Sequence, residues 1–190
     1  SIRVQTENIF PIIKKFLYSD HEIFLRELIS NAVDACQKLK TLASIGEMKG
    51  DIGDLAVTVK LDIEQKTITI SDKGVGMSAD EVEKYINQVA FSGAEEFVKT
   101  YKGQNENAII GKFGLGFYSA FMVSERVDIF TRSFRESEQA VRWECDGSPS
   151  YTLEACDKVD RGTEIILHIN EESAEFLDAA RIRTVLGKFC

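Results

Sequence analysis

The sequence is poor in the residues that build small disulfide-stabilised or zinc-bound proteins. Its 190 residues include two prolines, one tryptophan, two histidines and four cysteines. No two cysteines form a C-x-x-C pair, and no cysteine–histidine cluster has the spacing of a zinc site. A chain of this length can bury an apolar core without disulfides. We therefore expect reduced thiols that are incidental to function, in a cytoplasmic protein.

Long apolar runs and excess positive charge are also absent. No apolar run approaches the ~20 residues that cross a bilayer, and we expect neither a signal peptide nor a membrane partner. Acidic residues outnumber basic ones by 31 to 23, which gives a net charge of −8. This balance argues against nonspecific binding to nucleic acid. The length suits a single domain over residues 1–190, and the way the chain starts and stops predicts that it is excised from a longer protein.

Glycine, by contrast, is concentrated in one part of the chain. Seven of the 13 glycines lie between residues 74 and 116, where an even spread would place about three. Glycine permits positive φ angles and a close approach of backbone to backbone or ligand. This stretch is therefore where we look for a binding site.

Apolar periodicity and turn residues predict an α+β two-layer sandwich, with helices on one face of a mostly antiparallel twisted sheet. Helices are expected over residues 9–18, 19–42 and 78–89, near 116–123 and from about 172, the second and third beginning at capping boxes (Ser19 with Glu22, Ser78 with Glu81). Strands are expected over residues 56–62, 67–72, 127–133, 140–145, 150–154 and 162–169. The last four strands are predicted to form an antiparallel meander.

The long helix carries the first candidate for chemistry. Glu27, Asn31 and Asp34 follow at i, i+4 and i+7, so their polar groups share one stripe. Asparagine is a poor helix former at mid-helix, and a metal-binding amide beside a carboxylate base would explain it. Flanking apolar residues suggest that the stripe is only partly exposed. A solvated helix face remains the plain alternative.

Two glycine motifs follow. Asp72 ends a strand and is followed by Gly74 and Gly76, so its carboxylate could accept a hydrogen bond from a ring amino group, with the ring packed on the glycine backbone. A simple β-to-α turn is the alternative. Gly114 and Gly116 precede an expected helix, whose free N–H groups can hold a phosphate. Neither motif is a Walker loop or a dinucleotide fingerprint.

In this order the three motifs resemble those of the GHKL ATPase superfamily, which includes gyrases, heat-shock chaperones and histidine kinases. Residues 23–32 (IFLRELISNA) and 114–121 (GLGFYSAF) are similar to the ninety-kilodalton heat-shock chaperone family of bacterial type. The resemblance extends over about residues 6–169. It implies the Bergerat ATP-binding fold, with ATP or ADP and Mg²⁺ as cofactors.

The resemblance also implies roles for individual residues. Glu27 would be the general base for the attacking water, Asn31 would hold Mg²⁺, and Asp72 would read adenine with Thr163 behind it. Residues expected to contact the adenine and ribose are Asp34, Ala35, Lys38, Gly76, Met77 and Ile86. Residues expected to meet the phosphates are Gly114, Leu115, Gly116 and Phe117. Ser92 and Gly93 are expected to contact the nucleotide at the start of a lid over about residues 92–116.

Partners and activity follow from the same resemblance. It implies a homodimeric chaperone that acts on unfolded or client proteins, and family ATP-site inhibitors as ligands. The isolated domain is expected to be monomeric and to hydrolyse ATP weakly. Two departures from the family pattern, Tyr85 for asparagine and Phe91 for lysine, predict altered contacts near the ribose and the lid hinge.

Two rival functions remain open. One is a nucleotide-binding sensor that does not hydrolyse ATP. The other is the catalytic domain of a histidine kinase, which shares the asparagine and glycine motifs. That class lacks a water-activating glutamate before the asparagine, so Glu27 argues against it, and neither His21 nor His168 lies in a phospho-acceptor context.

Overall fold

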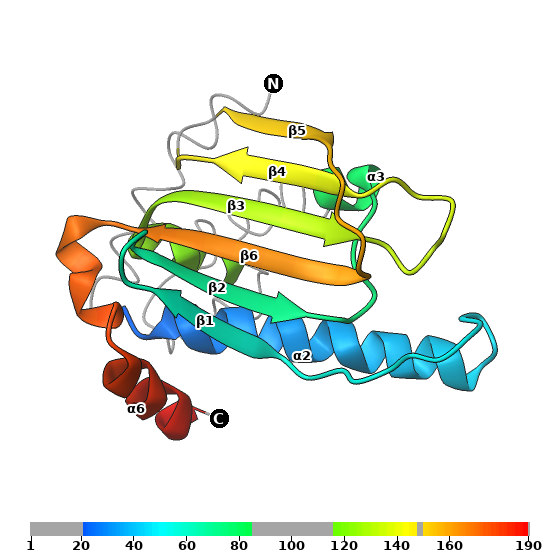
Figure 1. The fold of residues 1–190 in the computed structure, drawn as a ribbon, viewed down its shortest axis with the longest axis horizontal. Coiled ribbons are helices and arrows are strands. Elements are labelled where there is room, and N and C mark those ends of the chain that lie inside the picture. Colours follow the sequence, from blue (N-terminus) through cyan, green and yellow to red (C-terminus); the bar gives the residue numbers. More distant parts are fainter. Residues whose placement is uncertain (1–20, 85–115, 148–149, 190) are drawn as a thin grey trace, which may run out of the picture.

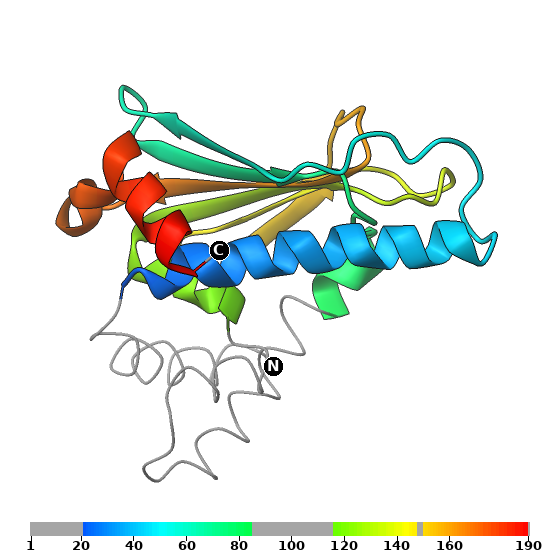
Figure 2. The same ribbon diagram turned by 90° about the horizontal axis from the view of Figure 1, so that it is seen from below.

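The computed structural model describes residues 21–84, 116–147 and 150–189. The expected helix over residues 9–18, Ser19 of the first capping box, and the two family departures lie outside these ranges. Within them the chain forms an α+β sandwich, as the sequence predicts. A six-stranded, fully antiparallel sheet is covered on one face by helices (Figures 1 and 2).

The strand order of the sheet is β1-β2-β6-β3-β4-β5. The strands are β1 (Thr58–Asp62), β2 (Thr67–Asp72), β3 (Ser124–Arg132), β4 (Val141–Cys145), β5 (Tyr151–Ala155) and β6 (Gly162–Ile169). Each overlaps an expected strand, with ends that differ by up to three residues. On the helix side, Ile68 and Ile70 of β2 and Leu167 of β6 are buried in the core.

The predicted four-strand meander is wrong at its last strand. β3, β4 and β5 are sequential neighbours, but β6 crosses back over the sheet and pairs with both β2 and β3 (Figure 1). Turn residues mark where a strand begins and ends, and they do not specify its neighbour. The central position of β6 places Thr163 opposite Asp72 on one side and Thr131 on the other.

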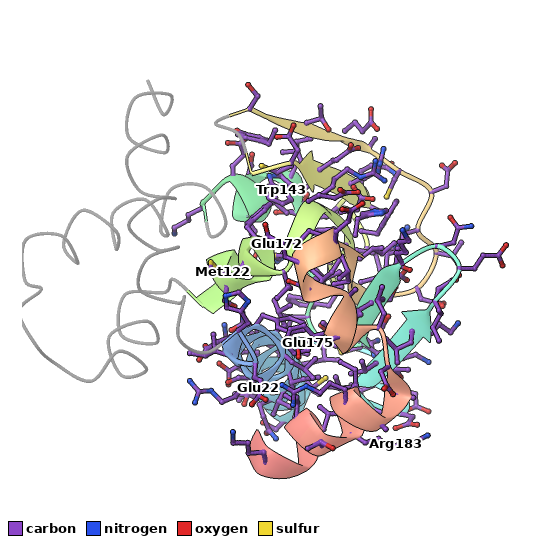
Figure 3. The ribbon with its side chains drawn as sticks, turned by 90° about the vertical axis from the view of Figure 1, so that its left-hand side faces the viewer. Glu22, Met122, Trp143, Glu172, Glu175 and Arg183 are labelled. Carbon is purple, nitrogen blue, oxygen red and sulfur yellow. The ribbon has the colours of Figure 1, made fainter. Side chains whose placement is uncertain are left out.

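The helix α2 (Ile23–Ser44) lies along the sheet, with buried apolar residues that include Phe24, Leu28 and Leu39. The helix begins four residues after Ser19, where the predicted capping box would start it, and Glu22 at its N-cap position makes no side-chain cap. Its carboxylate instead binds α6, with 2.5 Å to Arg181 and 3.2 Å to Lys188. Figure 3 shows Glu22 where α2 meets α6.

The other helices differ in part from the predicted ones, and residues 85–89 of the third expected helix lie outside the described residues. Ser78 and Glu81 form the predicted capping box at the start of α3 (Ala79–Val82). Gly116–Met122 is a 3₁₀ helix, η2, where we expected the start of an α-helix. The final helix is divided into a 3₁₀ helix, η3 (Glu171–Phe176), and α6 (Ala179–Phe189). Asn170 caps η3, Ser173 is kinked within it, and Leu177, with φ −82° and ψ 43°, ends it before α6 begins.

Both α2 and η2 lie on the same side of the sheet, and they pack against each other (Figure 2). This arrangement brings the polar stripe of α2, the end of β2 and the start of η2 to one side of the molecule. No helix in the described ranges is long and apolar enough to cross a membrane.

Candidate functional site

Asp72 is the last residue of β2, and it lies buried on the helix side of the sheet, with 9% of the residue exposed. Its Oδ1 accepts a hydrogen bond from the Gly74 N–H at 2.8 Å. A second backbone N–H, that of Thr163 across the strand pair, also hydrogen-bonds the carboxylate. The carboxylate is thus held by the backbone on two sides, and no described residue forms an ion pair with it.

Burial dominates the electrostatics of this group. Loss of hydration raises the pKa of Asp72 from 3.8 to about 6, while the two backbone N–H groups and the charge of Lys158 act to lower it. A carboxylate with a raised pKa inside a fold is a candidate for ligand binding, because no structural ion pair compensates its burial. Its chemistry suits a neutral N–H donor such as a ring amino group.

Thr131 is a member of the site that sequence reasoning missed. Its Oγ1 lies 2.8 Å from that of Thr163 and accepts a hydrogen bond from the Met77 N–H at 2.9 Å. The side chains of Thr131 and Thr163 are therefore fixed behind Asp72, as neighbours on β3 and β6. A single threonine in a strand carries no sequence signal, and only the position of β6 in the sheet reveals this one.

The glycines after Asp72 are needed for packing against protein. A Cβ on Gly74 would lie 2.5 Å from the backbone carbon of Ala35, and the Val75 N–H donates to the Ala35 carbonyl at 3.2 Å. Gly76 has a φ of +63°, and a Cβ there would lie 1.9 Å from the Arg132 carbonyl oxygen. These contacts give the two glycines a packing role on their Cβ sides, and the expectation that they also seat a ring stays a prediction. The turn docks onto α2 and places Ala35 beside Asp72.

The stripe on α2 is more exposed than the sequence suggests. Glu27 is half-buried, with 16% of its side chain exposed and the guanidinium of Arg26 at 3.1 Å. Asn31, Asp34 and Lys38 are exposed on the same helix. Beside the stripe, Leu28 and Ala32 are buried in the core, whereas Val33 is exposed.

The start of η2 is fixed by aromatic packing. Phe117 makes edge contacts with Trp143 of β4 at 5.7 Å and with Phe121 at 6.2 Å between ring centroids. Trp143 itself is buried in the core. Gly116 opens η2, so its backbone continues directly into this anchored turn. The other expected phosphate, ribose and lid contacts (Ile86, Ser92, Gly93, Gly114 and Leu115) lie outside the described residues.

Three of the four cysteines lie within the described residues. Cys36 and Cys156 are free thiols, the Cys145 sulfur accepts a hydrogen bond from the Gly147 N–H at 3.4 Å, and Cys190 lies outside the described residues. Across residues 21–84, 116–147 and 150–189, no three histidine, cysteine or acidic side chains form a metal-binding group. The arrangement combines a buried acceptor, a polar helix face with a carboxylate, and a turn that starts a helix.

A family model described as histidine kinase-, DNA gyrase B- and HSP90-like ATPase matches residues 18–163. The chain belongs to this ATPase family. The match runs from just before α2 into the start of β6, and thus includes Glu27, Asn31, Asp72 and Thr163.

Relatives within the family point to its HSP90-like branch. The chain is 67% identical over 190 residues to the chaperone protein HtpG of Porphyromonas gingivalis (strain W83) and 63% identical to that of Bacteroides thetaiotaomicron. These alignments cover 100% of this chain and 28% of each relative. HtpG of Shewanella amazonensis is 44% identical over 178 residues, 91% of this chain and 28% of the relative. The resemblance to the heat-shock chaperone family, and with it a nucleotide-binding ATPase domain, is thereby confirmed.

Proposed function

We propose that this chain is the domain with which a longer chaperone binds ATP with Mg²⁺ and hydrolyses it weakly. The chain spans 28% of the length of the relatives named above, and those relatives are chaperones. Residues 1–190 would then be a single nucleotide-binding domain. Membership of the family supports nucleotide binding. The residues described below support the orientation in which the nucleotide would bind.

The buried carboxylate of Asp72 is the observation that carries the proposal. It is held by the N–H groups of Gly74 and Thr163, and so presents its remaining acceptor capacity in a fixed direction. The exocyclic amino group of adenine is a donor that needs such an acceptor. Ala35 and Met77 belong to the segments around Asp72, which supports the expected adenine contacts there.

Glu27 and Asn31 suit the phosphate end of the nucleotide. They lie at i and i+4 on α2, hence on one face of the helix. Mg²⁺ in nucleotide sites keeps phosphate and water ligands and needs only one or two protein oxygens. The exposed amide of Asn31 fits that requirement, and bound Mg²⁺ would neutralise phosphate charge.

The proposed chemistry is in-line attack of water on the γ-phosphate. The carboxylate of Glu27 would accept the proton from the attacking water as general base. Backbone N–H groups near Gly116 and Phe117 would stabilise the charge that develops on the phosphate oxygens. Glu27 is half-buried, so its position is restrained while its carboxylate remains accessible.

Several expectations stay proposals of the same kind. They are the contacts of Asp34, Lys38, Gly76, Ile86, Ser92, Gly93, Gly114 and Leu115, and a lid over about residues 92–116. A cytoplasmic location, a homodimer of the longer protein, client proteins and binding of family ATP-site inhibitors also belong here. The family relationship supports them.

Calorimetric titration with ADP and Mg²⁺ tests the central proposal. Asp72→Asn should weaken ADP binding at least about tenfold, because the amide offers one acceptor and no charge. Asp62→Asn is the matched control, since Asp62 also ends a strand and binds a turn N–H but is exposed. Equal affinities of the wild type and Asp72→Asn would refute the adenine assignment.

A further inference from the structure

Arg161 joins two segments that lie far from it in the sequence. Its Nε–H donates to the Lys73 carbonyl at 3.0 Å, and its Nη2–H donates to the Ile52 carbonyl at 2.7 Å. Lys73 directly follows Asp72, while Ile52 lies in the loop between α2 and β1. A single planar guanidinium therefore fixes the turn after Asp72 to a second, separate loop.

The two residues after Arg161 act on the same turn. Gly162 has a φ of +113°, and a Cβ there would lie 2.1 Å from the Asp72 carbonyl oxygen. The Thr163 N–H then hydrogen-bonds the Asp72 carboxylate. Three consecutive residues thus contact the Asp72–Lys73 backbone or the Asp72 side chain. The start of β6 therefore holds the Asp72 carboxylate and the turn after it in place.

The loop before Arg161 is also held in place. Arg132 of β3 donates from Nη1 to the Lys158 carbonyl at 3.1 Å, and the Lys158 ammonium donates to the Asp160 carbonyl at 2.6 Å. Lys158 is close enough to stabilise the ionised form of Asp72. Two residues of one loop therefore act on Asp72 in different ways. Lys158 supplies positive charge, and Arg161 fixes the geometry of the turn after Asp72.

We propose that Arg161 is a positioning residue for nucleotide recognition, which fixes the Asp72 carboxylate in the direction that selects a base carrying an amino group. This inference rests on the proposed function. Lysine cannot replace arginine in this role, because its ammonium lacks the planar fork that reaches two carbonyls in a fixed geometry. A hydrogen bond to a base requires alignment within a few tenths of an ångström, which a released turn would lose.

The test compares two nucleotides that differ only at the base. ADP carries the 6-amino group and purine riboside 5′-diphosphate lacks it, so the ratio of their Kd values isolates the contact with Asp72. Titration calorimetry with Mg²⁺ would be run on the wild type, Arg161→Lys and Arg161→Gln. We expect both variants to bind ADP about tenfold more weakly and purine riboside diphosphate almost unchanged.

Controls separate positioning from general loss of structure. Arg183→Lys makes the same exchange at an exposed position of α6 and should change neither Kd. A variant that merely loosened the domain would lose affinity for both nucleotides equally and leave the ratio unchanged. Such an unchanged ratio in both Arg161 variants would overturn the inference.

The same data distinguish failure of the inference from failure of the proposed function. If the wild type binds the two nucleotides equally, the assignment of Asp72 as adenine reader fails. If the wild type discriminates, Asp72→Asn abolishes discrimination and both Arg161 variants retain it, only the role of Arg161 is refuted. Loss of discrimination in both Arg161 variants supports it.

Discussion

At the scale of the residue, Asp72 shows a conflict between ligand binding and stability. Most buried carboxylates are paired with a cation, but this one has two backbone N–H groups and a raised pKa. An ionised group in that position opposes folding, since burial removes its hydration. The ligand then supplies the donor that the protein itself omits. Nucleotide binding and the stability of the free domain should therefore respond to pH in opposite directions.

The pKa of Asp72 makes this prediction specific. The folded pKa, about 6, lies above the ordinary value of 3.8, so the folded state retains the proton to higher pH. The stabilisation that this gives is complete below about pH 4 and is lost as the pH rises through 6, in total about 3 kcal/mol. Other acids, including Glu22 with its lowered pKa, change stability with pH as well. The measurement is thus the difference between wild type and Asp72→Asn in urea unfolding from pH 4 to 7.

We expect Asp72→Asn to gain stability relative to the wild type as the pH rises over that range. ADP affinity of the wild type should fall below pH 6, because the protonated carboxyl accepts less well from an amino group. Parallel pH curves for the two proteins in unfolding would contradict the raised pKa.

At the scale of the element, the site depends on how one turn packs against one helix. Gly74 allows the turn after β2 to approach Ala35, and the Val75 N–H bonds the carbonyl of that residue. The contact sets the distance between Asp72 and the polar stripe of α2. The helix and the strand are each predictable from periodicity. Their relative position is set by the absence of a side chain at Gly74.

Replacement of Gly74 by alanine should separate the two elements. Its Cβ would lie 2.5 Å from backbone that cannot move without shifting α2, so we expect a loss of about 2–4 kcal/mol in the free energy of unfolding. ADP binding should weaken as well. Gly187→Ala is the matched control, since nothing lies within 4 Å of its Cβ. Because residue 187 lies in a helix, the Gly187→Ala variant should gain up to about 1 kcal/mol in the free energy of unfolding. Equal stability of the two variants, measured by urea unfolding, would argue against the docking contact.

At the scale of the whole molecule, the described residues explain the proposed binding of ATP more completely than its proposed hydrolysis. The cationic side chains on α2, the helix that carries the polar stripe, are Arg26, Lys38 and Lys40. The chain spans 28% of the length of its relatives. We therefore propose that the rest of a longer protein completes the catalytic site.

Steady-state ATPase measurements test that division. The 190-residue chain should turn over ATP much more slowly than the longer protein, while the two bind ADP similarly. Glu27→Ala in the longer protein should reduce kcat about 10²-fold or more and leave ADP affinity nearly unchanged, because the base acts on water alone. Unchanged hydrolysis would favour the sensor without hydrolysis. Equal turnover of the short and long chains would contradict the division.

Local signals along the chain specify the class of fold, most strand positions and the family. Periodicity and capping residues are local, and so α2, β2 and the capping box of α3 can be predicted before any tertiary contact is known. The order of Glu27, Asn31, Asp72 and the glycine motif carried the family resemblance. These signals depend on spacing along the chain, which the linear sequence contains in full.

The residues that surround Asp72 are set by contacts between segments that are distant in the chain. The insertion of β6 between β2 and β3 brought Thr163, Thr131 and Arg161 to the acceptor, although they are far from it in sequence. Tertiary packing also brings Glu22 to α6 and leaves Asn31 and Asp34 exposed. Strand neighbours and helix docking depend on how apolar faces and backbone groups are satisfied across the whole fold. That information lies in the sum of long-range contacts and in no single stretch of sequence.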